Sequence, residues 1–136
     1  MASPIGSGEP RMKRILRGFT LVELMVVMAI IALLLALALP RYFNHLERSR
    51  ETILKQDLAT MRDAIDKYHG DRGRYPDSLD DLVRSRYLRA LPVDPITERS
   101  DSWQIVPPSN EEAGAVYDIR SGAPGTARDG SAYADW

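Results

Sequence analysis

The stretch RGFTLVELMVVMAIIALLLALALPRYF, residues 17–43, decides the fold because its apolar run is long enough to cross a membrane. Residues 19–39 number 21 and include one charged residue, Glu23, and one hydroxyl residue, Thr20. Wound as a helix, this run would span about 32 Å, close to the hydrocarbon thickness of a bilayer. A carboxylate at the bilayer centre costs about 3 kcal/mol on translocon scales, so Glu23 requires a specific explanation.

The charge of the chain is unevenly distributed. The 136 residues have a formal net charge of -1, yet the first 18 hold four basic residues against one acid, which leaves 14 basic and 18 acidic residues for the remainder. A basic flank favours the cytoplasmic side, so we expect the leader to stay inside and the region after the apolar run to be exported. The exported part is not basic, which argues against a broad nucleic-acid-binding surface.

Two ordinary classes of protein carry an apolar run near the amino terminus. A secretory signal peptide would be cleaved after Ala36-Leu37-Ala38, but the apolar regions of signal peptides run only about 7–15 residues. A plain membrane anchor accounts for the length and orientation of the run but leaves Glu23 unexplained.

A third class accounts for the residues at the start of the run. The sequence Gly18-Phe19-Thr20-Leu21-Val22-Glu23, after a basic leader, resembles the processing site of the type IV pilins and type II secretion pseudopilins. The resemblance implies that a prepilin peptidase/methyltransferase cleaves after Gly18 and methylates Phe19. It makes Glu23 the assembly glutamate at the fifth mature position. Pro40 matches the family proline near the end of the membrane segment and, lacking an amide hydrogen, should kink the helix.

Cleavage would supply Glu23 with a partner of opposite charge. The new α-amino group has an ordinary pKa of about 8 and is mostly cationic at neutral pH. Pairing this cation with Glu23 of a neighbouring subunit would reduce the cost of two separate charges in lipid and would bias subunits toward one axial register. The alternative is that Glu23 reaches back to the amino end of its own helix, where acids are favoured. The two contacts are compatible.

Beyond Pro40 the sequence has the pattern of an amphipathic helix. One apolar stripe recurs at helical spacing and consists of Leu46, Leu54, Leu58, Met61, Ile65 and Tyr68. We expect one long helix over roughly residues 19–69, with Gly70 as its left-handed cap. A coiled coil is the alternative for the stripe, but two to three heptads favour packing onto a small domain instead.

The remaining residues predict a small mixed domain. Asp77 or Ser78 can cap a short helix, and two prolines make residues 91–95 an extended connector. Residues 103–106 and 115–119 predict two strands that pair as an antiparallel hairpin over the stripe. Residues 121–136 have no periodicity and are expected to form an ordered loop.

The predicted fold class is therefore α+β and pilin-like. A long N-terminal helix, transmembrane in its first half and amphipathic in its second, packs on a small C-terminal head with a short antiparallel sheet. The domains are the leader (1–18), the transmembrane segment (19–39), the amphipathic continuation (40–69) and the periplasmic head (70–136).

The head adds a narrower resemblance. Tyr75-Pro76, Leu91-Pro92, Asp94-Pro95 and the ending from Asp118 to Trp136 are similar to the G-type major pseudopilin in sparse pieces. Major type IV pilins usually close a carboxy-terminal loop with a disulfide, and this chain has no cysteine, which favours the pseudopilins.

The narrower resemblance implies a calcium ion in the final loop, with Ser121, Asp129 and Asp135 as candidate ligands. Calcium takes six to eight oxygen ligands in flexible geometry. Pro124 stands where the family pattern has an aspartate and cannot replace it as a ligand. A solvated acidic turn is the alternative for each aspartate.

No nucleophile–base pair and no phosphate-binding loop stand out, so we expect no enzyme. The aromatic residues Trp103, Tyr117, Tyr133 and Trp136 have little basic charge nearby, which favours a small core and an aromatic seal over nucleic-acid stacking.

The resemblance gives the expected location and partners. It implies a single-pass protein of the bacterial inner membrane, with a cytoplasmic leader and a periplasmic head, extracted into a periplasmic filament. The partners would be identical subunits in a homo-oligomeric filament, other pseudopilins, the prepilin peptidase/methyltransferase, the inner-membrane assembly platform and membrane lipid. The alternatives are a major or minor type IV pilin, serving adhesion, motility or DNA uptake, and a monomeric membrane-tethered binding module.

Overall fold

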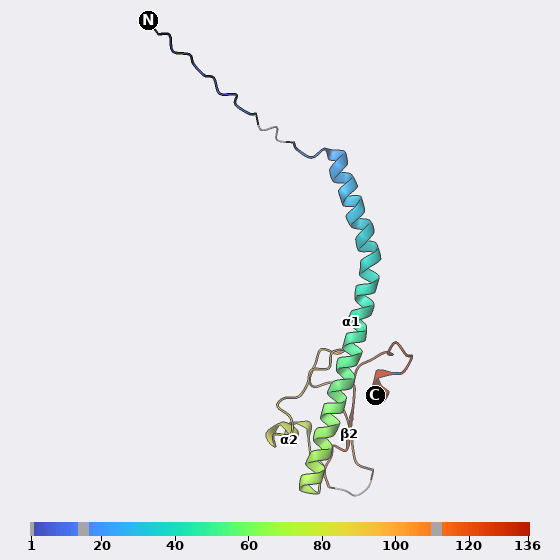
Figure 1. Ribbon diagram of the computed structural model, residues 1–136. Helices are drawn as coiled ribbons and strands as arrows, with labels where there is room; N and C mark the ends of the chain where they lie inside the picture. The colour runs from blue at the N-terminus through green and yellow to red at the C-terminus, as the bar shows by residue number, and fades with distance from the viewer. Residues whose placement is uncertain (1, 14–16, 110–112) are drawn as a thin grey trace. The chain divides into compact units, whose positions relative to one another are not determined.

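The computed structural model describes residues 2–13, 17–109 and 113–136. Parts of the predicted leader (residue 1 and residues 14–16) and of the loop between the predicted strands (residues 110–112) lie outside the described residues. The elements are α1 (Leu21–Arg72), α2 (Leu79–Arg84), β1 (Gln104–Val106), β2 (Asp118–Arg120) and the 3-10 helix η1 (Tyr133–Asp135) (Figure 1). The prediction of an α+β fold with a long N-terminal helix and a short antiparallel sheet is confirmed.

The chain divides into two compact units, Met1–Leu39 and Pro40–Trp136. In the first unit, α1 begins at Leu21, because Thr20 caps it. The Thr20 hydroxyl accepts a hydrogen bond from the Glu23 amide at 3.1 Å, and the Thr20 carbonyl accepts one from the Leu24 amide at 3.1 Å. The apolar side chains of this unit are exposed on every side of the helix, the pattern of a helix that needs an apolar environment around it.

In the second unit, α1 continues to Arg72, three residues beyond the predicted end. Gly70 lies inside the helix, so its prediction as the cap is wrong. Gly73 takes the left-handed position instead, with φ +69°, and its amide donates to the His69 carbonyl at 2.8 Å. A glycine suits this position because it has no Cβ to oppose a positive φ.

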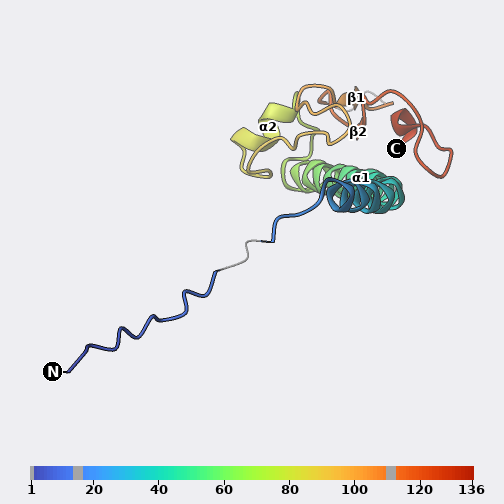
Figure 2. The same ribbon diagram turned by 90° about the horizontal axis from the view of Figure 1, so that it is seen from above.

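The predicted apolar stripe of α1 forms one side of the hydrophobic core of the head. Its members from Leu54 to Tyr68 are buried, whereas Leu46 remains 38% exposed. The core therefore begins two turns later than the full stripe suggests. Figure 2 shows α2, the sheet and the C-terminal segment on one side of α1. These elements and the chain between them complete the core with Leu79, Leu82, Leu88, Trp103, Val116 and Ile119.

The sheet has two strands, β1 and β2, paired antiparallel with Ile105 opposite Ile119. The strand predicted at residues 103–106 is close to β1, but β2 begins at Asp118, later than the predicted 115–119. The reason is a competing partner, because the amides of Ala115 and Val116 donate to the Pro76 carbonyl at 3.1 and 2.9 Å. These residues are thereby held to the segment that follows α1 and not to β1.

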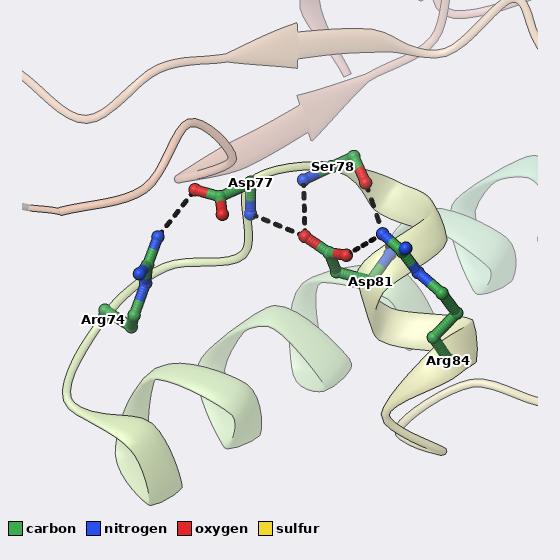
Figure 3. A network of polar contacts seen from close by, with 5 residues as sticks. All are labelled: Arg74, Asp77, Ser78, Asp81 and Arg84. Carbon is green, nitrogen blue, oxygen red and sulfur yellow. Dashed lines mark hydrogen bonds and ion pairs between the residues drawn. The ribbon is translucent and has the colours of Figure 1, made fainter.

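The short helix α2 begins with a reciprocal pair of hydrogen bonds (Figure 3). The Ser78 hydroxyl accepts from the Asp81 amide at 3.3 Å, and the Asp81 carboxylate accepts from the amides of Ser78 and Asp77 at 3.2 and 3.1 Å. This is a capping box with aspartate in the third position. Arg74 pairs with Asp77 at 2.7 Å, and Arg84 pairs with Asp81. Ser78, and not Asp77, is therefore the cap.

We predict that Ser78→Ala lowers the free energy of unfolding of the head by about 1 kcal/mol, because the Asp81 amide loses its acceptor. Ser85→Ala is the matched control, since Ser85 follows the same helix and its side chain makes no hydrogen bond among the described residues. Chemical unfolding followed by tryptophan fluorescence measures both. Equal losses in the two variants would contradict the capping role.

Candidate functional site

The predicted cleavage site lies in exposed, non-helical chain. Gly18 and Phe19 precede the first residue of α1, and Phe19 is 85% exposed. A Cβ built on Gly18 would have no neighbouring atom within 4 Å among the described residues. Because the Thr20 cap starts the helix after Phe19, the Gly18–Phe19 peptide bond is free of helical hydrogen bonding. The bond is therefore accessible to a peptidase.

Glu23 lies in the first turn of α1, and its side chain is exposed. Its amide is bound by Thr20, but its carboxylate has no hydrogen bond or ion pair within the described residues. The alternative contact, in which the carboxylate bonds to the amino end of its own helix, is not formed among the described residues. The charge is thus available to a group from outside the single described chain, and its pairing with a neighbouring subunit stays a prediction.

Pro40 lies inside α1, which continues through it as regular helix. Because proline has no amide hydrogen, the Ala36 carbonyl lacks its usual helical donor there. The kink expected at Pro40 stays a prediction. By length and composition, α1 is the one helix among the described residues that is suited to cross a membrane.

The candidate calcium ligands lie in different surroundings. Ser121 is fully buried, and its hydroxyl donates to Asp94 at 2.8 Å and accepts from the Ala123 amide at 3.1 Å. Asp129 is exposed and accepts from the amide and hydroxyl of Ser131 at 2.9 and 2.5 Å. Asp135 is exposed in η1. Within the described ranges, no three histidine, aspartate or glutamate side chains gather where they could hold a metal ion.

The hydrogen bonds from Ser131 hold the pKa of Asp129 below its usual value. The nearby charge of Lys55 acts in the same direction. Asp129 is therefore a carboxylate that already has donors and a cation beside it. Calcium binding stays a prediction.

Sequence reasoning missed Asp94, which is a buried anchor for two segments of the head. Its carboxylate is fully buried and accepts from the Ile96 and Thr97 amides at 2.8 and 3.2 Å as well as from the Ser121 hydroxyl. Buried carboxylates need such donors because desolvation penalises an unpaired charge. The sequence predicts an extended connector around the Asp-Pro pair, and it gives no sign of the bond to Ser121, 27 residues away.

Sequence reasoning also missed Glu51, an acid on α1 that holds the C-terminal loop, which is residues 121–136. One Glu51 oxygen accepts from the Arg128 amide at 2.9 Å and from the Tyr133 hydroxyl at 3.1 Å. The Arg128 guanidinium donates to the Asn44 carbonyl at 3.3 Å. Burial and the bond to Glu51 raise the pKa of Tyr133, so its hydroxyl remains a proton donor at neutral pH.

The end of the C-terminal loop is held by its aromatic residues. The Lys55 ammonium lies 4.4 Å from the Trp136 ring centroid, and the indole N–H donates to the Ser131 hydroxyl at 2.7 Å. Tyr133 and Trp136 pack edge to face at 5.2 Å. We call Glu51, Lys55, Arg128, Tyr133 and Trp136 the Glu51 clamp. Trp103, by contrast, is a core residue whose indole donates to the Pro92 carbonyl at 2.9 Å.

Comparison with known proteins agrees with this arrangement. Residues 14–39 match the family model of the prokaryotic N-terminal methylation motif. The type II secretion system core protein G of Escherichia coli strain K12 is 32% identical over 124 residues, which cover 79% of this chain and 81% of that protein. The chain belongs to the type II secretion core protein G family.

Other relatives place this pseudopilin in a wider group. Core protein G of Pseudomonas aeruginosa is 34% identical over 94 residues, 57% of this pseudopilin and 66% of that protein. The fimbrial protein EcpC of Eikenella corrodens is 27% identical over 128 residues, 88% of this pseudopilin and 81% of that protein. No solved structure matches it significantly. Its relatives are thus named as secretion and fimbrial proteins, and its single N-terminal apolar helix fits a single-pass inner-membrane protein.

Asp57, on the second half of α1, is an acid whose ionisation is unfavourable in the folded chain. Burial and the charge of Asp94 raise the pKa of Asp57 above 3.8. The contribution of protonated Asp57 to the free energy of unfolding is therefore fully present below pH 3.8. It is lost as the pH rises through the higher pKa that Asp57 has in the folded state. We predict that Asp57→Asn increases the free energy of unfolding at neutral pH and flattens its decline above pH 3.8.

Asp63→Asn is the control for this prediction, because Asp63 is exposed and pairs with Lys67 at 2.6 Å. Unfolding curves at several pH values distinguish the two variants. A loss of stability in Asp57→Asn at pH 7 would contradict the assignment.

Proposed function

We propose that this pseudopilin is cleaved after Gly18, methylated at Phe19 and polymerised into a periplasmic pseudopilus that serves type II protein secretion. The single observation that carries the proposal is the similarity to the Escherichia coli core protein G, because it extends over 79% of the chain and so includes the head. The methylation motif at residues 14–39 supports the processing step.

Assembly would use the two features that a single chain leaves unsatisfied. The apolar side chains of residues 21–39 are exposed, so they need lipid before assembly and neighbouring helices afterwards. The Glu23 carboxylate would pair with the α-amino group of Phe19 in the next subunit. This contact is far stronger in a low-dielectric surrounding than in water, so it favours one axial position of the added subunit.

The partners that we propose follow from this route. The prepilin peptidase/methyltransferase would act on the exposed segment around Gly18 and Phe19, and the inner-membrane assembly platform would receive the processed subunit. Identical subunits and other pseudopilins would form the filament. The head would lie in the periplasm, because the basic leader favours the cytoplasmic side.

A type IV pilin is the second candidate, favoured by the match to EcpC over 88% of the chain. Deletion of the gene in its native host separates the two functions. Loss of protein export to the medium with intact surface pili supports the secretion function, whereas loss of pili with intact export supports the pilin function and contradicts our proposal.

We predict that the protein extracted from membranes of its native host begins at Phe19 and carries one methyl group on its amino terminus. Intact-mass measurement and amino-terminal sequencing test this directly. A start at Leu39 would indicate a signal peptide, and an intact leader in a host with an active prepilin peptidase would indicate a tethered module.

We predict that Glu23→Gln, which keeps the shape of the side chain but removes its charge, reduces filament assembly at least about tenfold, a loss of roughly 1.4 kcal/mol per subunit contact. Membrane insertion and cleavage should be unchanged. Glu23→Asp is the matched variant, because it retains the charge and should assemble better than Glu23→Gln. Shearing and cross-linking of filaments measure the effect, and normal assembly by Glu23→Gln would rule out the charge pair.

A further inference from the structure

The C-terminal loop is attached to the rest of the head at its start, middle and end. At its start, the buried Ser121 hydroxyl bonds to Asp94. In its middle, the Arg128 amide bonds to Glu51 of α1. Near its end, the Tyr133 hydroxyl reaches the same Glu51 oxygen, and the Trp136 ring lies under the Lys55 ammonium. Protein groups therefore contact the loop in each third of its length.

The charge beside the loop is unsuited to a divalent cation. A shallow recess between α1 and the loop is lined by Arg48, Glu51, Lys55, Arg128 and Asp129. Three of these five side chains are cationic and two are anionic, so a metal ion bound through Asp129 in this recess would meet excess positive charge. Ser121 and Asp135 do not line the recess. Fixed cations repel a divalent ion more strongly than a monovalent one, because the Coulomb energy scales with the product of the charges.

Two of the three candidate calcium ligands, Ser121 and Asp129, already have protein partners, whereas the exposed Asp135 carboxylate has no hydrogen bond or ion pair among the described residues. The Ser121 hydroxyl has no exposed surface and uses its proton and one lone pair on Asp94 and the Ala123 amide. One Asp129 oxygen accepts two hydrogen bonds from Ser131. Pro124 offers no side-chain oxygen. The residues present therefore do not fit the calcium site that the family resemblance implies.

We propose that the Glu51 clamp, and not a bound calcium ion, holds the C-terminal loop of this chain on α1. The head would then fold and keep its loop in place without calcium, in a chain that has no disulfide to do so. The proposal concerns the single subunit, so it is independent of whether the filament is a pseudopilus or a pilus.

The experiment uses the full chain in detergent micelles and probes the loop with trypsin, which cleaves after Arg128. We expect the rate of this cleavage and the midpoint of thermal unfolding to be the same in EGTA and in about 10 mM CaCl₂. This concentration exceeds the dissociation constants of the weakest calcium sites in extracellular modules. MgCl₂ at equal concentration controls for ionic strength. Protection of Arg128 or a saturable rise in the midpoint with calcium alone would overturn the proposal.

Two variants test the clamp itself. Glu51→Ala should be cleaved after Arg128 at least tenfold faster than the parent chain, and calcium should not restore protection. Glu47→Ala, one turn earlier on α1, is the matched control, because Glu47 makes no hydrogen bond or ion pair among the described residues. Glu51→Gln retains an acceptor oxygen and should give an intermediate rate.

Loop release must be distinguished from loss of the fold. Cooperative unfolding followed by circular dichroism reports the core independently of Trp136, and we expect Glu51→Ala to remain folded at a temperature where Arg128 is cleaved rapidly. Cleavage of Glu51→Ala at the parental rate with an intact core would overturn the clamp. General unfolding of Glu51→Ala, restored by calcium, would also overturn it, because the metal would then be the element that holds the head.

Discussion

Burial of the α1 stripe from Leu54 to Tyr68 is the constraint on which the head depends. The head has few elements of regular structure: one turn and a half of helix, two three-residue strands and a short 3-10 helix. None of these could bury an apolar face alone, since two-stranded ribbons of this length are at best marginally stable. The helix α2 and the strand β2 place Leu79, Leu82 and Ile119 in the core with the stripe, and β1 is held by its pairing with β2. The irregular backbone between them is tolerated because it lies at the surface and is held by specific polar contacts.

The first and second halves of α1 need different surroundings. Around residues 21–39 it is apolar on all sides and nothing in the described chain covers it, whereas from Leu54 onward it is apolar on one side and that side is covered. The exposed Glu23 carboxylate belongs to the first region. A single subunit therefore has apolar surface and a carboxylate without partners among the described residues. This agrees with its membership of a family of proteins that assemble into filaments. Its head, in contrast, satisfies the described buried polar side chains internally.

Periodicity made the helix and most of its buried stripe predictable, because every third or fourth residue must face the same side. Local chemistry also located the short helix, since Ser78 is a good cap and acids follow it. The errors arose where two local signals competed or where none existed. Gly70 and Gly73 are both suitable caps, and local sequence offers no means to choose between them. Arg86 and Glu98 adopt positive φ with no glycine to signal their turns. Glu51 and Asp94 form hydrogen bonds with residues 82 and 27 positions away in the sequence. The periodicity of helices and strands cannot predict contacts over such separations.

The order of elements along the chain has a consequence for biosynthesis. The stripe on α1 is made first, but its covering residues are made later, with Ile119 near the end of the sequence. At about 5–20 residues per second, the chain from Tyr68 to Ile119 takes roughly 3–10 s to synthesise. During that time the nascent helix presents an uncovered apolar face. This face is open to non-native contacts until the residues around Ile119 have been made, so the head closes only late in synthesis.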